Sequence, residues 1–165
     1  MITLKNVLVA TDFGDASQTA LAYGRDLTRT FGATLHVLHV VDDVRVRAMG
    51  SEGYTIELAD VQRAVETWAR DQLDSIVHDD DRRELAATVV QRTSIATASA
   101  IVSYAKEANI DLIVMGTQGR DGLAHLFMGS VAERVVRTAP CPVLTVRHPE
   151  HEFIAPDALQ AVARV

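Results

Sequence analysis

The sequence has little of what would tie it to a membrane, a metal centre or a disulfide framework. It contains one cysteine, Cys141, so no intrachain disulfide can form, and no cysteine–histidine cluster has zinc spacing. No apolar run approaches the roughly eighteen residues that suggest a membrane-spanning helix. Residues 1–6 lack the basic-then-apolar pattern of a signal sequence. We therefore expect a reduced, cytoplasmic protein without a membrane anchor.

An excess of basic residues is also missing. Lysine and arginine total 16 against 22 acidic residues, which gives a formal net charge of −6 and a pI near 5.4. Such a balance argues against nucleic acid or an anionic membrane as a partner. A local basic loop could still hold one small anion.

What is present is a hydrophobic content of 48% in 165 residues, enough to bury one core of ordinary size. We expect one domain over residues 1–147, followed by a tail at 148–165. Apolar runs alternate with helical patterns along this domain. Strands are expected at 7–10, 34–41, 85–90, 111–115 and 143–146, and helices at 17–30, 56–78, 97–108 and 130–138. Residues 42–55 are expected to form a loop, and 79–81 an acidic turn.

The apolar positions in the two longer helices predict which faces are buried. The first helix should end at Gly32 and bury Ala20, Tyr23, Leu27 and Phe31. The long helix should direct inward Leu58, Val61, Val65, Trp68, Leu73 and Ile76.

Continuous apolar strands joined by helices predict an α/β fold: a single doubly wound domain whose parallel sheet has helices on both faces. Right-handed crossovers leave few topologies. In the order 3-2-1-4-5, the first and fourth strands are neighbours where the winding reverses, and ligands bind in such a crevice. Asp12 and Gly116 would then meet although they are far apart in the sequence.

Three glycines and a serine follow the fourth strand with the spacing Gly116-x2-Gly119-x9-Gly129-Ser130. A glycine-rich loop that leads into a helix, here with Ser130 as the expected cap, can cradle a phosphate, because the backbone approaches closely and the helix amides donate. The spacing is neither the dinucleotide fingerprint nor a P-loop. Arg120 and His125 add positive charge. The alternative is that the glycines only make turns.

This motif resembles the nucleotide-binding motif of the universal stress protein family. The similarity extends to residues 113–117, 129–136 and 139–144, and to 7–12 at the first strand, so it covers about Lys5 to Arg147. The resemblance implies the strand order 3-2-1-4-5 and an adenine nucleotide as ligand. It also implies a homodimer joined through the short apolar edge strand of Val143, Leu144, Thr145 and Val146.

The nucleoside end of the expected site is less certain than the phosphate end. Asp12 suits ribose hydroxyls or the amino edge of adenine, but it could equally serve as a turn or helix cap. The resemblance implies that this acid helps hold the nucleoside and that Val40 or Val41 contacts adenine. The residues expected to contact the nucleotide are Thr11, Asp12, Val40, Val41, Met115, Gly116, Thr117, Gly119, Arg120, Gly129, Ser130 and Val131.

Some residues differ from the family pattern, and some histidines raise the question of a metal site. Ile95 and Thr97 stand where the family commonly has glycine and proline, which weakens that wall of the site, and Gln118 replaces a frequent histidine. His36 and His39 face opposite sides of a strand and are not a metal pair. A chelate in the tail, from His148, Glu150 and His151, is disfavoured.

We expect a stress-response regulatory protein that binds ATP or AMP, with Mg²⁺ accompanying the phosphates of ATP. Little or no hydrolysis is expected, because Asp121 is the only acid close to the loop glycines. Two alternatives stay open: a slow ATPase, and a homodimeric interaction module that binds no nucleotide.

Overall fold

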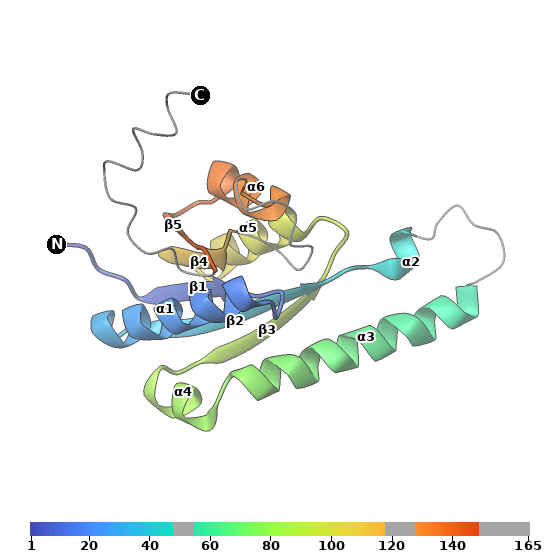
Figure 1. Ribbon diagram of the computed structural model, residues 1–165, viewed down its shortest axis with the longest axis horizontal. Helices are drawn as coiled ribbons and strands as arrows, with labels where there is room; N and C mark the ends of the chain where they lie inside the picture. Colours follow the sequence, from blue (N-terminus) through green and yellow to red (C-terminus); the bar gives the residue numbers. More distant parts are fainter. Residues whose placement is uncertain (48–54, 118–127, 149–165) are drawn as a thin grey trace, which may run out of the picture.

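The computed structural model describes residues 1–47, 55–117 and 128–148, which form a five-stranded parallel sheet with the order β3-β2-β1-β4-β5 (Figure 1). This confirms the predicted fold class and strand order. The strands are β1 (Asn6–Ala10), β2 (Thr34–Val41), β3 (Thr88–Thr93), β4 (Leu112–Gly116) and β5 (Val143–Val146). The helices are α1 (Asp15–Phe31), α2 (Val44–Arg47), α3 (Thr55–Ile76), α4 (Asp79–Glu84), α5 (Thr97–Glu107) and α6 (Ser130–Thr138).

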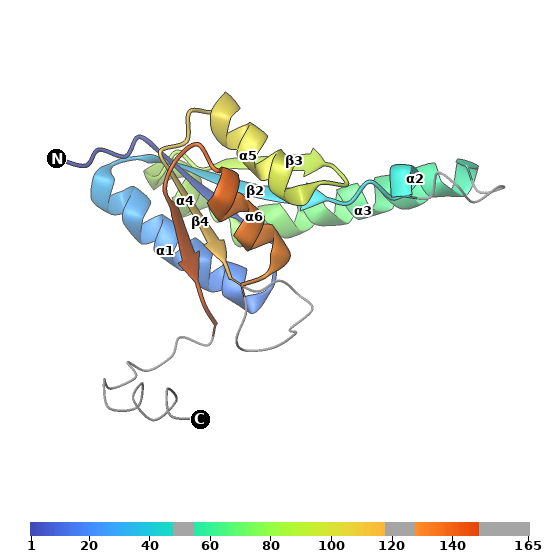
Figure 2. The same cartoon turned by 90° about the horizontal axis from the view of Figure 1, so that it is seen from above.

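Helices cover both faces of the sheet (Figures 1 and 2). On one face, Ala20 and Leu21 of α1 and Leu73 of α3 join a buried cluster with alternate residues of the strands. On the other, Ile101 of α5 and Val135 of α6 join a second buried cluster. Helices therefore pack on both faces of the sheet, and a ligand is expected to bind at the ends of the strands.

The central strand β1 pairs in parallel with β2 and with β4, with Ala10 opposite both Leu38 and Met115. The winding reverses between β1 and β4, so the carboxyl ends of these two strands open at one edge of the sheet. Gly32 ends α1 in the left-handed conformation, φ 61°, as its place after the helix predicted.

The buried face of α3 differs from the predicted one. Val61, Val65 and Trp68 are exposed, Trp68 by 41%. Leu73 is buried as predicted, and the other buried residues of the described part of α3 are Gln62 and Ala69. Gln62 is 2% exposed because its amide is satisfied: Oε1 accepts from the Val44 amide at 2.9 Å, and Nε2 donates to Oε1 of Glu66 at 2.9 Å. Gln62, a polar residue with hydrogen-bond partners, therefore occupies a buried position on α3, while part of the predicted apolar stripe faces solvent.

The prediction for α1 was also wrong in part, since Tyr23 and Phe31 are exposed. The helix instead buries mostly small residues, which let it lie close to the sheet: Ala16, Ser17, Ala20, Leu21, Gly24 and Thr28.

Two further boundaries differ from the prediction. Residues 44–47 of the expected loop form α2, whose start is supported by Asp43 Oδ1 accepting from the amides of Arg45 and Val46. The acidic turn is the first turn of α4, where carboxylates are favoured by the helix dipole. Because α4 takes residues up to Glu84, β3 begins at Thr88, three residues later than expected.

Candidate functional site at the carboxyl ends of β1 and β4

Two buried threonines stand directly after the paired strands β1 and β4. Thr11 is 8% exposed and Thr117 is 7% exposed. Both are held by backbone bonds to neighbouring strands: the Thr11 amide donates to the carbonyl of Leu38 at 2.9 Å, and the Thr117 amide to that of Val146 at 2.8 Å. The sheet therefore brings together the two segments that the strand order predicted would meet.

The hydroxyl of Thr11 is fully used inside the protein. Ser17 Oγ donates to the carbonyl of Gly14 at 2.8 Å, so in the 3.0 Å contact between Ser17 Oγ and Thr11 Oγ1 the threonine donates. Thr11 Oγ1 also accepts from the Phe13 amide at 3.0 Å. Thr11 thus ties the end of β1 to the start of α1, and its side chain has a structural role.

Asp12 fits both interpretations that the sequence left open. Its Oδ1 accepts from the Gly14 amide at 3.0 Å, so one carboxylate oxygen shapes the turn into α1. Gly14, not Asp12, is the N-cap of that helix. The second oxygen, Oδ2, makes no hydrogen bond within the described part of the chain, and the side chain is half-buried. One oxygen therefore holds the turn while the other can still accept a hydroxyl.

Phe13, which the sequence analysis did not single out, has a left-handed backbone with φ 67°. A non-glycine residue in this region is strained by about 1–2 kcal/mol. Its ring lies between two others: the centroid is 4.3 Å from that of His39 and 5.5 Å from that of Trp68, which meets it edge-on. His39 Nδ1 donates to the carbonyl of Thr11 at 2.8 Å. No sequence pattern predicts a left-handed phenylalanine at this position.

Gly116 is needed for packing, whatever the loop binds. A Cβ at this position would lie 2.9 Å from the Cβ of Ala16 and 3.0 Å from its carbonyl carbon. The first glycine of the motif therefore allows α1 to lie against the end of β4, which is a reason independent of phosphate.

Thr117 is the contrasting residue. Its carbonyl accepts from the Gly129 amide at 2.6 Å, which places it beside the start of α6, but its Oγ1 is buried with no hydrogen-bond partner in the described residues. An unsatisfied buried hydroxyl costs about 1–3 kcal/mol. Two other buried side-chain atoms share this condition, His36 Nε2 and Gln91 Oε1, but they lie within strands and not at a strand end.

The amino end of α6 differs from the predicted serine cap. The N-cap is Gly129, with φ −59° and ψ 150° and no side-chain capping bond, and Ser130 is the first helical residue. Within the described residues, the first amides of this nine-residue helix therefore have no side-chain cap, and the helix starts directly after the residue whose amide bonds to the Thr117 carbonyl. Uncapped amides and a positive dipole end favour an anion. Val131 is half-buried and packs against the α5–α6 core, and Met115 lies within it.

The end of β2 separates the two candidate valines. Val41 is 1% exposed, and its carbonyl accepts from the Ser94 amide at 2.9 Å. Val40 is half-buried and packs against the α5–α6 cluster. The exposed side chain of Ile95 follows Ser94, where the family commonly has glycine. Val40 is therefore the more accessible of the two.

Several of the residues expected at the site or in a metal chelate cannot be placed in the structure. Gly119, Arg120, Asp121 and His125 lie outside the described residues, as do Glu150 and His151. His148 Nδ1 contacts Thr19 Oγ1 at 3.1 Å. Among the described ranges, no group of three or more histidine, cysteine, aspartate or glutamate side chains could hold a metal ion, and no helix could span a bilayer.

Residues 3–147 match the model of the universal stress protein family. The chain belongs to this family. A universal stress protein of Methanocaldococcus jannaschii is 30% identical over 149 residues, covering 90% of this chain and 85% of the relative. Among solved structures, the universal stress protein UspA from Lactobacillus plantarum has a TM-score of 0.77 and 28% identity, covering 89% of this chain and all of that one.

A second solved structure is a universal stress protein in complex with cAMP. Its TM-score is 0.55 at 22% identity, and it covers 88% of this chain and 98% of that one. At this identity the likeness concerns the fold alone.

Proposed function

We propose that this universal stress protein binds ATP or AMP in the crevice between β1 and β4 and acts as a cytoplasmic regulatory protein whose state follows nucleotide occupancy. The observation that carries the proposal is the buried hydroxyl of Thr117, which has no hydrogen-bond partner among the described residues, on a residue whose carbonyl accepts from the Gly129 amide at the start of α6. A phosphate oxygen there would accept from this hydroxyl and from the helix amides, so that a group that costs stability without a ligand would become satisfied.

The nucleoside would occupy the other side of the crevice. Oδ2 of Asp12 is suited to accept from a ribose hydroxyl, and a carboxylate there would repel phosphate. Val40 would pack on the adenine face beside Val41. The phosphates would lie along Gly116, Thr117, Gly129, Ser130 and Val131, with Gly119 and Arg120 as further proposed contacts. Mg²⁺ would accompany the phosphates of ATP. The fold relative that holds cAMP is consistent with an adenine nucleotide in such a crevice.

Calorimetric titration with ATP, ADP and AMP tests the proposal. The backbone of Gly129 is extended, so valine can adopt it without strain, but its branched side chain would stand at the phosphate position. Gly129→Val should weaken ATP binding at least tenfold, or about 1.4 kcal/mol. Thr138→Val, at the opposite end of α6, is the matched control and should bind like the wild type. If the wild type binds none of the three at millimolar concentration, the nucleotide-free interaction module is the better reading.

We also propose a homodimer through the edge of β5. Val143, Leu144 and Thr145 are only half-buried, and the strand pairs with β4 on one side alone. An apolar edge of this kind is a template for pairing with a second copy. Light scattering should give twice the chain mass at tens of micromolar, and a monomer would contradict this part of the proposal.

Hydrolysis should be slow, because efficient phosphoryl transfer needs a positioned metal and a group that orients the attacking water. Thr117 and Ser130 supply hydroxyls, but a hydroxyl alone does neither. Phosphate release from MgATP should fall far below the median enzyme rate of about 10 per second. A rate near one per second that disappears in a Ser130→Ala variant would instead make the chain an ATPase.

A further inference from the structure

Three aromatic rings connect the exposed side of α3 to the turn that carries Asp12. The Trp68 ring meets the Phe13 ring edge-on, with interplanar angle 85°, and the His39 ring lies on Phe13 at 34°. Phe13 is the residue directly after Asp12. The Phe13 side chain therefore links α3 to the turn at the proposed nucleoside site.

The same rings explain how a strained turn persists. Phe13 is held at φ 67°, a conformation that a phenylalanine in an open loop would leave. The two neighbouring rings hold its side chain, and the Nδ1 proton of His39 fixes the preceding carbonyl of Thr11. If Phe13 were released to an ordinary backbone conformation, the 3.0 Å bond between Asp12 Oδ1 and the Gly14 amide would not keep its present geometry.

We infer that Trp68 and His39 are positioning residues for nucleotide recognition: by clamping Phe13 in its left-handed conformation they aim the carboxylate of Asp12 at the nucleoside. This inference rests on the proposed function. Neither residue needs to touch the nucleotide, because Trp68 and His39 both contact Phe13, the residue directly after Asp12. The clamp acts on the nucleoside end of the site, not on the phosphate end at Thr117 and α6.

The test compares AMP with inorganic tripolyphosphate, which has no nucleoside, by calorimetry on the full chain. Trp68→Leu keeps an apolar side chain but loses the ring edge, and should weaken AMP binding about fivefold, the loss expected for one aromatic pair. Its affinity for tripolyphosphate should stay within about twofold of the wild type. Trp68→Phe should restore AMP affinity. Val61→Ala, on an exposed position of the same helix, is the control and should change neither affinity.

A second variant guards against a general loss of folding. Phe13→Gly removes the clamped ring, yet glycine adopts the left-handed conformation readily, so the chain should still fold. It should lose AMP affinity at least as strongly as Trp68→Leu, because the turn is then no longer held.

A double-mutant cycle with Asp12→Asn separates positioning from a merely structural role. If the clamp acts through Asp12, Trp68→Leu should add less than about twofold in the Asp12→Asn background. A full additional loss there, or an equal loss for AMP and tripolyphosphate, would overturn the inference. Unchanged AMP binding in Trp68→Leu would overturn it while leaving the proposed function intact. If the wild type binds neither AMP nor ATP, both this inference and the proposed function are wrong.

Discussion

Polar groups at the two ends of the parallel sheet differ in whether they find hydrogen-bond partners within the protein. At the amino end, the carboxylates and amides of the described residues bond to one another. Asp111 Oδ2 accepts from the amides of Lys5 and Asn6, at 2.7 and 2.9 Å, and Asn6 Nδ2 donates to the carbonyl of Asn109. At the carboxyl end, the buried hydroxyl of Thr117 has no hydrogen-bond partner among the described residues.

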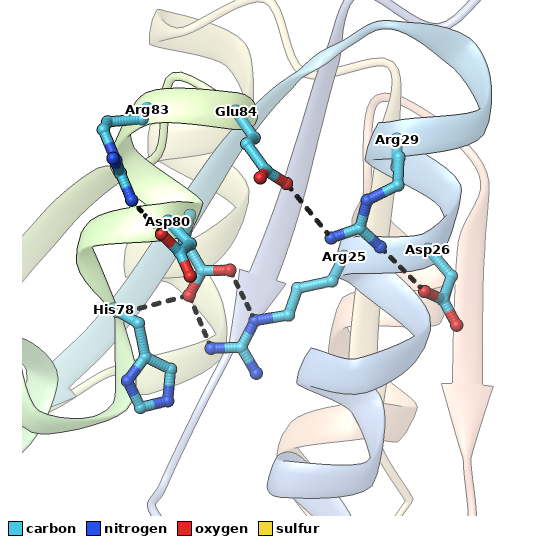
Figure 3. Close-up of polar contacts among 8 residues, drawn as sticks. Arg25, Asp26, Arg29, His78, Asp80, Arg83 and Glu84 are labelled. Carbon is cyan, nitrogen blue, oxygen red and sulfur yellow. Dashed lines mark hydrogen bonds and ion pairs between the residues drawn. The ribbon is translucent and has the colours of Figure 1, made fainter.

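An ion pair at the amino end joins α1 to α4. Arg25 donates from Nε and Nη2 to the two carboxylate oxygens of Asp81, at 2.8 and 2.6 Å, and Asp81 also accepts from the His78 amide. In Figure 3, Arg25 and Arg29 extend from α1 toward the segment that carries His78 and Glu84. Burial alone would raise the pKa of Asp81, but the bonds from Arg25 and His78 outweigh it and hold the pKa below its ordinary value.

The difference between the ends teaches where stability and binding are located. At the amino end, the polar groups named above satisfy one another within the protein. The carboxyl end leaves donors unsatisfied, which is the condition that a ligand relieves. Substitutions at the amino end should therefore change stability alone, whereas at the carboxyl end substitutions of Thr117 or Gly129 should change binding.

The largest effect on stability is expected from breaking the Arg25–Asp81 pair. Arg25→Ala should lower the free energy of unfolding by about 2–3 kcal/mol, because it leaves a buried carboxylate without its main partner. Urea denaturation measures this, and nucleotide affinity should not change. Arg29→Ala is the matched control: its partners Asp26 and Glu84 are exposed, so less than about 0.5 kcal/mol should be lost. Equal losses in the two variants would remove the special role of Asp81.

Substitutions of Gly116 and Gly129, two motif glycines near Thr117, should have different effects: the first should change stability and the second ATP affinity. Gly116→Ala forces a Cβ against the backbone of Ala16 and should destabilise the fold by about 2 kcal/mol. Gly129→Ala meets no backbone strain, so its stability should change by less than about 0.5 kcal/mol while ATP affinity falls. If both substitutions changed only stability, or both only affinity, the distinction would be wrong.

The smallest effect is a pH dependence at His36, whose Nδ1 lies 2.7 Å from the Tyr104 hydroxyl. Burial lowers the pKa of His36, so the unfolded chain takes up a proton at this side chain more readily than the folded one. Its contribution is therefore present above the unfolded pKa of about 6.5 and is lost as the pH falls below it. Between pH 7.5 and 5.5, His36→Gln should lose less stability than the wild type. A parallel decline in the two proteins would contradict this assignment.

Acid should affect Asp81 in a separate, lower window. Because its folded pKa is lowered, its contribution is present above the unfolded pKa of about 4 and is lost as the pH falls through the folded value. The His36 and Asp81 effects can thus be measured apart in one pH series.

The sequence predicted the parallel sheet, its order and the pairing of the first strand with the fourth, because continuous apolar strands that alternate with helices leave few topologies. It mistook the buried face of α3, since an apolar period cannot reveal that Gln62 is satisfied by Val44 and Glu66. It also missed the clamp on Phe13, because a left-handed backbone depends on tertiary contacts with His39 and Trp68. It assigned one role to all three glycines, whereas the space around Gly116 is known only from the fold.

The matched pair Thr11 and Thr117 tests the central claim most directly, because both are buried after adjacent strands but, among the described residues, only the Thr11 hydroxyl has hydrogen-bond partners. Thr11→Val should cost about 1–2 kcal/mol of stability, whereas Thr117→Val should cost nothing or add about 1 kcal/mol. The decisive measurement is ATP titration and urea denaturation of Thr117→Val side by side. We predict unchanged or higher stability together with an affinity at least tenfold weaker, or about 1.4 kcal/mol. A less stable Thr117→Val that binds ATP like the wild type would contradict the account.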